Sequence, residues 1–287
     1  METVKNVRKY STPPGNRNIS KTEGHPSVPV PGRDAAIPQC STIFTAQTTY
    51  STGSKPSSLN VVDVNGDGKP DIIVTNRGSN NVGVLLNIGN GTFSAQTTYS
   101  TGILPASVAA TDVNGDGKPD IIVANSNSNN VSVLLNTGNG TFAVQTTYST
   151  SNWPASVVAA DVNGDGKPDI IVTNFGSNNV GVLLNIGNGT FSAQATYSTD
   201  SSPGSVAAAD VNGDGKPDII VANSNSNNVG VLLNTGSGTF AVQTTCSTGA
   251  GSNPYYVAVG DVNGDGKPDI IVANYGSNNI SVLLNYC

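Results

Sequence analysis

Hydrophobic and polar residues follow one another in short runs along this chain, and the same succession of runs returns five times. One unit, starting at Ser107, reads SVAATDVNGDGKPDIIVANSNSNNVSVLLNTGNGTFAVQTTYSTS. It contains four apolar or alternating runs, SVAAT, DIIVAN, NVSVLLN and FAVQTTYST, which are separated by Gly, Asn, Asp and Pro. Runs without helical periodicity, bounded by turn residues, are typical of β-strands. The pattern therefore predicts an all-β protein with four strands in each unit.

A nonapeptide, DVNGDGKPD, sets the period, and its copies begin at Asp63, Asp112, Asp161, Asp210 and Asp261. The copies are 49, 49, 49 and 51 residues apart, whereas a calcium-binding β-roll repeats about every nine residues. Within a unit the runs change from small residues, to continuously apolar, to half-polar, to mostly polar. That gradient suits a β-propeller blade, whose inner strand crowds the axis and whose outer strand faces water. An open array of β units is the main structural alternative.

The two ends of the chain favour a closed ring over an open array. The C-terminal segment NNISVLLNYC stops after the third strand of the fifth unit, while CSTIFTAQTTYSTG from Cys40 matches GNGTFSAQTTYSTG from Gly89. This N-terminal strand can complete the fifth blade and leave no open edge. We predict a five-bladed β-propeller of four-stranded antiparallel blades over residues 40–287, with the ring closed by the N-terminal strand.

Two of the three cysteines also indicate that the ring is closed. Cys40 and Cys287 both align with Gly89, so both fall in one hairpin turn that the chain break has opened. We expect a disulfide between them, and two unrelated thiols are the alternative. Cys246 stands where the other units have an outer-strand tyrosine, and we interpret it as a simple substitution.

Residues 1–39 have a different composition. They are rich in Pro, Gly and polar residues, lack apolar periodicity and include the single histidine, His25. Such a segment is expected to be disordered. No apolar region typical of a signal peptide follows Met1, and no run in the chain is long enough to span a membrane.

Acidic residues are concentrated in the nonapeptide. Only 11% of residues are charged, and 15 of the 19 acidic residues lie in its five copies. Positions 1, 3, 5 and 9 are Asp, Asn, Asp and Asp, Gly at position 6 permits a sharp turn, and the carbonyl of Lys at position 7 can point inward. Several oxygen ligands on a tight loop are what Ca²⁺ requires. Position 12 is Val, as at Val74, rather than the bidentate Glu of an EF-hand, and an apolar strand follows in place of a helix.

We therefore expect about five calcium ions, one for each loop. A turn formed by Asx side chains alone is the alternative, but it leaves three carboxylates repelling one another without a cation. From residue 40 onward, 16 acidic and seven basic residues give a formal charge of −9, which five Ca²⁺ would change to +1. The expected ligands are Asp63, Asn65, Asp67, Lys69, Asp71, Asp112, Asn114, Asp116, Lys118, Asp120, Asp161, Asn163, Asp165, Lys167, Asp169, Asp210, Asn212, Asp214, Lys216, Asp218, Asp261, Asn263, Asp265, Lys267 and Asp269.

The segment DVNGDGKPDIIVAN, followed by NNVSVLLNTGNGTF, resembles the FG-GAP/VCBS repeats of integrin-α-like β-propellers. The resemblance covers about residues 41–287. It implies a β-propeller, calcium ligands at the loop positions named above, and a role in adhesion, in lectin-like carbohydrate binding or as a non-catalytic part of a larger extracellular protein. Integrin heads have seven blades and this chain shows five repeats, so an integrin-type partner subunit does not follow.

The types of residue in the repeat region argue against an enzyme and against a nucleic-acid-binding protein. Outside the loops the repeat region offers no nucleophile–base pair and no free carboxylate pair, so we do not expect an enzyme. Five of its seven basic residues lie in the acidic loops, which argues against nucleic-acid binding. We expect an extracellular or cell-surface module that binds a glycan or a protein and does not insert into a membrane. The alternatives are a structural spacer of a larger assembly and a non-catalytic part of a polysaccharide-active enzyme.

Comparison of the five units indicates where a ligand would bind. The calcium loops and the GNGT turns share one end of the propeller and are almost invariant between units. The residues that vary lie at the opposite end, and they include the single Trp. Aromatic residues and Arg favour carbohydrate stacking and protein hot spots, and sequence drift in unconstrained loops is the alternative. The expected ligand-binding residues are Arg77, Trp153, Phe175, Tyr255, Tyr256 and Tyr275.

Overall fold

The computed structural model describes residues 47–286, all of them in strands, turns and connecting segments apart from one short 3-10 helix, η1 (Ser224–Ser226). The chain divides into two compact units, Met1–Thr48 and Thr49–Cys287, and every described strand lies in the second. The N-terminal tail, residues 1–39, and the two cysteines expected to pair, Cys40 and Cys287, lie outside the described residues. The described residues contain no helix long and apolar enough to cross a membrane.

Each repeat begins with three adjacent antiparallel strands. The innermost strands start at a proline and are β1 (Pro56–Val62), β7 (Pro105–Thr111), β13 (Pro154–Ala160), β19 (Pro203–Ala209) and β25 (Pro254–Gly260). The second strands start at the last Asp of the nonapeptide and are β2 (Asp71–Asn76), β8 (Asp120–Asn125), β14 (Asp169–Asn174), β20 (Asp218–Asn223) and β26 (Asp269–Asn274). The third strands are β3 (Asn81–Leu85), β9 (Asn130–Leu134), β15 (Asn179–Leu183), β21 (Asn228–Leu232) and β27 (Asn279–Leu283).

The remainder of a unit differs from the single fourth strand expected from the sequence. A separate two-stranded hairpin comes first, formed by β4 (Asn87–Gly89) with β5 (Thr92–Phe93), β10 (Asn136–Gly138) with β11 (Thr141–Phe142), β16 (Asn185–Gly187) with β17 (Thr190–Phe191), and β22 (Asn234–Gly236) with β23 (Thr239–Phe240). The outer strands then follow as β6 (Thr97–Ser100), β12 (Thr146–Ser149), β18 (Ala195–Ser198) and β24 (Thr244–Ser247). Asn90 and Gly91, at the positive φ values of 53° and 71°, form the tight turn between β4 and β5.

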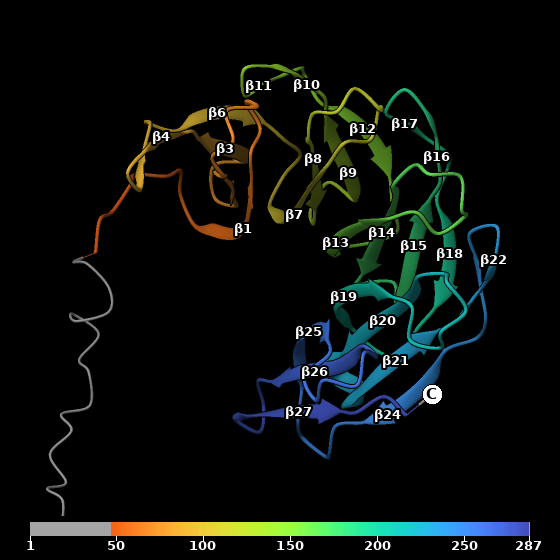
Figure 1. Ribbon diagram of the computed structural model, residues 1–287. Helices are drawn as coiled ribbons and strands as arrows, with labels where there is room; N and C mark the ends of the chain where they lie inside the picture. Colours follow the sequence, from red (N-terminus) through yellow and green to blue (C-terminus); the bar gives the residue numbers. More distant parts are fainter. Residues whose placement is uncertain (1–46, 287) are drawn as a thin grey trace, which may run out of the picture. The chain divides into compact units, whose positions relative to one another are not determined.

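These strands form four four-stranded antiparallel sheets and, within the described residues, one three-stranded sheet, β25–β26–β27. The innermost strands line the concave side of an arc, and the outer strands lie on its convex side (Figure 1). The all-β class and the repeated four-stranded antiparallel sheets are confirmed. The described residues do not form a closed ring, so the expected closure by the N-terminal strand stays a prediction.

The hydrophobic core is divided into four clusters, each between two neighbouring sheets. The second strand supplies residues to both sides, because consecutive side chains of a strand point to opposite faces. Ile121 of β8 packs with the first sheet and Ile122 with the third, and both are fully buried. The continuous apolar run DIIVAN is therefore a strand buried on both faces, as its sequence predicts.

Hydrogen bonds connect the sheets at constant spacing. The Ser107 hydroxyl of β7 accepts the Val157 N–H of β13 at 3.3 Å, and the neighbouring sheets repeat this bond. Near the hairpins, the Asn136 side-chain amide donates to the Val64 carbonyl of the preceding unit at 2.8 Å. Each unit is thus positioned by the one before it.

The first and last sheets lack this support on one face. Leu59 of β1 is 65% exposed, while Val108, at the same place in β7, is 6% exposed. Ile280 of β27 is 68% exposed, while Val82 of β3 is fully buried. Two apolar faces, one at each end of the arc, are therefore uncovered in the described part of the chain.

Candidate functional site

The aspartate loops join each innermost strand to its second strand. In the first loop, the Asp63 carboxylate accepts the Gly66 N–H at 2.8 Å and the Gly68 N–H at 2.7 Å. The two glycines take positive φ values of 77° and 79° that few other residues adopt. Burial acts to raise the pKa of Asp63, but its backbone N–H donors outweigh that effect and hold the pKa below its ordinary value.

The central aspartate of the loop lies beside a lysine. Asp67 Oδ2 is 3.0 Å from Lys69 Nζ, and the second, third and fourth loops repeat this pair at the same distance. The hydrogen bond from Lys69 lowers the pKa of Asp67. Such exposed pairs contribute little stability by themselves. In the fifth loop, Asp265 Oδ2 instead accepts the Asn263 side-chain amide at 3.0 Å.

The last aspartate of the nonapeptide is fully buried and joins two parts of the unit. Asp120 accepts the Val113 N–H of its own loop at 2.9 Å and the Asn136 N–H of the following hairpin at 2.7 Å. The other four units contain the same two bonds. Burial raises the pKa of Asp120, and the charges of Asp116 and Asp112 raise it further.

This donor set fits a hard cation in its chemistry. Three carboxylates, one amide oxygen and one main-chain carbonyl occur within nine residues, and oxygen donors of this kind are those that Ca²⁺ prefers. The charges of Asp116 and Asp112 raise the pKa of Asp120, and a cation between these carboxylates would offset that repulsion. Among the described residues, however, no three acidic or other metal-binding side chains surround one point. The amide and carbonyl oxygens would have to complete the site.

The opposite end of the innermost strands encloses a cavity of about 530 Å³. Five of the six residues predicted to bind ligand line it: Arg77, Trp153, Phe175, Tyr255 and Tyr256. Tyr275 is not part of the lining, but its ring centroid lies 6.2 Å from that of Tyr255. The structure therefore brings together residues from the first, third and fifth units.

Comparison of the units did not indicate the small residues of the cavity wall. Ser57, Ser58, Ser107, Ser156 and Ser205 from the innermost strands line it, as do Leu104, Ala106, Ser126, Asn127, Ala155 and Gly204. In four units the third residue of the innermost strand is Ser, and this recurrence is the sequence feature that could have predicted the cavity wall. Small residues are expected near a crowded propeller axis in any case, so these serines did not predict a polar cavity wall.

Five equivalent residue pairs, called the rim pairs, lie at this end of the sheets, and five of their ten residues line the cavity, namely Arg77, Leu104, Ser126, Trp153 and Phe175. In each pair, the residue before the innermost strand accepts a backbone N–H bond from the residue after the second strand, at 2.9–3.1 Å. The pairs are Lys55 with Arg77, Leu104 with Ser126, Trp153 with Phe175, Ser202 with Ser224, and Asn253 with Tyr275. Because the bond is between backbones, the side chains are free to differ.

The first residue of every rim pair has a left-handed backbone, with φ between 44° and 60°, although none is glycine. Trp153 is one of them, at φ 55°, and its N–H donates to the Asn129 side chain at 2.9 Å. Non-glycine residues with this conformation are uncommon and strained. Trp153 is 57% exposed, and its ring stacks on Phe175 with a centroid distance of 6.5 Å and an interplanar angle of 24°.

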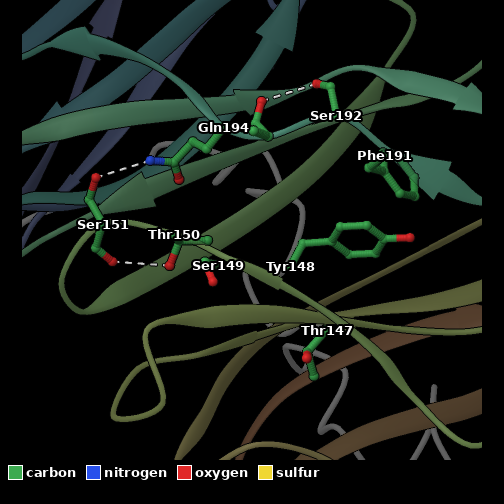
Figure 2. A pocket seen from close by; sticks show the side chains of 9 residues that line it. Thr147, Tyr148, Ser149, Thr150, Ser151, Phe191, Ser192 and Gln194 are labelled. Atoms are coloured by element: carbon green, nitrogen blue, oxygen red, sulfur yellow. Dashed lines mark hydrogen bonds between the residues drawn. The ribbon is translucent and has the colours of Figure 1, made fainter.

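A second cavity, of about 460 Å³, lies beside the outer strand β12 (Figure 2). Tyr148 and Phe191 line it in edge-to-face contact, with ring centroids 5.4 Å apart, and Gln194 donates to Ser151 Oγ at 3.0 Å. No charged residue lines it. It contains none of the predicted site residues and suggests no particular chemistry.

Comparisons with solved structures show the fold. Catalytically inactive virginiamycin B lyase from Staphylococcus aureus with quinupristin is 16% identical, with a TM-score of 0.59 over 82% of this chain and 69% of that chain. BBS1N in complex with ARL6DN is 16% identical, with a TM-score of 0.56 over 83% of this chain and 68% of that chain. A chain of the Photorhabdus luminescens Tc holotoxin pore is 24% identical, with a TM-score of 0.44. That match covers 77% of this chain and only 11% of the toxin chain.

Sequence comparisons point to one family. No curated protein matches the chain. The model of the FG-GAP-like repeat matches it four times, over residues 63–123, 112–172, 161–221 and 210–272. Each match begins at the first aspartate of one nonapeptide and ends in or beside the second strand of the next unit. The chain is therefore a member of the FG-GAP-like repeat family, built on β-propeller-like sheets.

Proposed function

We propose that this protein is a calcium-stabilised extracellular β-propeller that binds a glycan or a protein ligand without catalysing a reaction. The observation that carries the proposal is the clustering of five of the six variable rim and loop residues in one cavity. The repeated framework around them is nearly constant, so the differences between units are concentrated where a ligand could make contact. A structural spacer in a larger assembly is the alternative.

A glycan array combined with a pull-down from extracellular material tests the proposal. The purified chain is used beside a Trp153→Ala, Phe175→Ala double variant, with equal thermal stability as the condition for comparison. Binding that the double variant loses supports a ligand site at the cavity. Absence of any ligand in both experiments, or binding that the double variant retains, would instead favour the spacer function or a different surface.

The proposed absence of catalysis rests on the residues near the cavity. Its lining contains no Asp, Glu, His or Cys, so it offers no carboxylate, imidazole or thiol that could act as a general base or activate its serine hydroxyls. The lyase likeness is below 20% identity and concerns the fold, and a fold alone does not carry an activity.

We also propose that the chain closes into a five-bladed ring, and contacts of Tyr50 support this. Its ring centroid lies 5.5 Å from that of Phe93, at 80°, and its hydroxyl is 3.4 Å from the Gly91 carbonyl. The outer-strand Tyr99 makes the same contacts with Phe142 and Gly140 of the next unit. Tyr50 thus occupies the place of an outer-strand tyrosine from a sheet that precedes the first.

The fifth sheet offers that place. It has three described strands, and β27 leaves Ile280 exposed where β3 buries Val82 against Tyr99. By repeat equivalence, Ile280 would pair with Tyr50, and Asn279 with Ser51. Leu284, which is 40% exposed, would then reach Gly91, as Leu86 reaches Gly140. A Cys40–Cys287 disulfide would secure the same hairpin.

A further inference from the structure

We propose that the ligand of the 530 Å³ cavity is an anionic saccharide, a sugar unit carrying a carboxylate. This inference rests on the proposed binding function and specifies its ligand class. Its carboxylate would lie at Arg77, and its pyranose ring would lie against the Trp153–Phe175 pair.

The first step is the distribution of charge. Seven basic residues occur from residue 40 onward, and five of them lie in the acidic loops. Of the other two, Arg77 lines the cavity, and its backbone N–H donates at 3.0 Å to the carbonyl of Lys55, which is not part of the lining. No acidic residue lines the cavity. An Arg in the lining of a cavity without a neutralising carboxylate favours an anion, and Arg binds carboxylates with paired hydrogen bonds.

The second step is the aromatic part of the rim. Trp153 and Phe175 are nearly parallel, and Trp153 keeps more than half of its surface exposed at a strained backbone position. A flat exposed ring supplies a large contact area with little loss of conformational entropy. The apolar face of a pyranose ring matches that shape. Arg77 lies in the first unit and the aromatic pair in the third, so they reach the same cavity from different sheets.

The third step is the cavity wall, which favours a polyol over an acidic peptide. Serines of four innermost strands line it, and Ser107, Ser156 and Ser205 each accept one N–H from the next strand. A hydroxyl that accepts one bond can still donate its own hydrogen. A wall of small hydroxyl groups can therefore bond several ligand hydroxyls, and its small side chains leave room for a sugar ring.

Titration calorimetry with three probes tests the ligand class: trigalacturonic acid, its fully methyl-esterified neutral form, and tetraglutamate, all in 2 mM Ca²⁺. We expect trigalacturonate to bind at least about ten-fold more tightly than its neutral form, which is the range of a charge-assisted contact. Arg77→Gln should remove most of that preference, while Trp153→Ala should weaken both sugars about equally. Val242→Ala, at a 92% exposed position outside the cavity, is the control variant.

The outcomes separate the ligand class from the binding function. Equal affinity for the charged and neutral sugars, or a charge preference that survives Arg77→Gln, overturns the anionic saccharide while leaving a Trp153-dependent binding site intact. Binding of tetraglutamate in preference to both sugars overturns the saccharide in favour of an acidic peptide. No binding of trigalacturonate overturns the inference, and the glycan array and pull-down then decide separately whether the binding function stands.

Discussion

At the scale of single residues, a left-handed backbone precedes the innermost strand in all five units. Sequence comparison indicated that Trp153 and Phe175 vary where other positions are constant, and the structure places them in one cavity. It could not indicate the positive φ of the residue before each proline, because Lys, Leu, Trp, Ser and Asn have no common preference for that conformation. The strain comes from the tertiary fold, which fixes the backbone through the neighbouring Asn side chain.

Leu104 allows this strain to be measured. Replacement by Gly relieves a left-handed conformation that costs roughly 1–2 kcal/mol in other residues, against a loss of roughly 0.5–1 kcal/mol from the greater freedom of Gly in the unfolded chain. We expect Leu104→Gly to be about 0.5–1 kcal/mol more stable than Leu104→Ala in urea unfolding. The Ala variant is the matched control, because it loses the same side-chain contacts and keeps the strain. A less stable Gly variant would show that the rim is not strained.

The buried aspartate also makes a residue-scale prediction. Asp120 accepts two backbone N–H groups, so Asp120→Asn brings an amide donor against a backbone donor. We expect a loss of about 2–4 kcal/mol in the free energy of unfolding in EGTA, and a larger loss in calcium because Asp120 is also an expected ligand. Asp116→Asn, which changes a half-exposed residue, is the comparison. It should cost under about 1 kcal/mol in EGTA and more in calcium. Equal effects of the two variants in EGTA would contradict the structural role of Asp120.

At the scale of elements, the hydrophobic pattern predicted the first three strands of each unit well. The run DIIVAN is buried on both faces and NVSVLLN forms the neighbouring strand, since apolar periodicity reports burial directly. The fourth run was predicted less well. It separates into a hairpin strand and an outer strand, because Phe142 turns inward to Tyr99 of the preceding unit while Thr146–Ser149 pairs with β9. That division depends on a contact between units, which no local pattern contains.

The uncovered face of β27 gives the element-scale test of closure. If residues 48–51 cover Ile280, then Ile280→Ala should cost about 2–4 kcal/mol, as expected for a buried side chain. In an open array its present 68% exposure would make the change nearly neutral. Val131→Ala, at the equivalent fully buried place in β9, is the matched control. Urea unfolding measures both, and size-exclusion chromatography shows whether a second copy, rather than the same chain, covers the face. A neutral Ile280→Ala in a monomer would refute closure.

At the scale of the whole molecule, repetition made the fold predictable and left its ends undecided. The interface between neighbouring sheets occurs four times in the described residues, so the contacts of one unit predict those of the next. The contact between the first and last units is the one that no interior copy guarantees. Tyr256 also stands there in place of the serine that links the other innermost strands. Closure is therefore the property that needs solution measurements most.

A disulfide would make closure covalent. We expect intact-mass measurement without reductant to find one disulfide per chain, and peptide mapping to place it between Cys40 and Cys287. Cys246, which is exposed and unpaired, should remain a free thiol. A loop of this length would contribute about 5 kcal/mol in the chain-entropy model. A free thiol at Cys287 in protein made under oxidising conditions would exclude the bridge, and an intermolecular bridge would indicate assembly between copies.

Calcium should affect the molecule as a whole, because every loop lies between two strands of the core. Extracellular calcium modules bind with dissociation constants of roughly 10⁻⁴–10⁻³ M. At millimolar Ca²⁺ each site would then add about 1–1.5 kcal/mol, and five sites about 5–7 kcal/mol. That is comparable with the roughly 5–15 kcal/mol that stabilises a typical domain.

We expect EGTA to lower the melting temperature sharply and metal analysis to find close to five calcium ions per chain. Magnesium at the same concentration is the control for ionic effects, since Mg²⁺ demands a tighter octahedral site. If the melting curve is the same in EGTA and in calcium, the loops hold their shape through the backbone N–H bonds and lysine pairs alone.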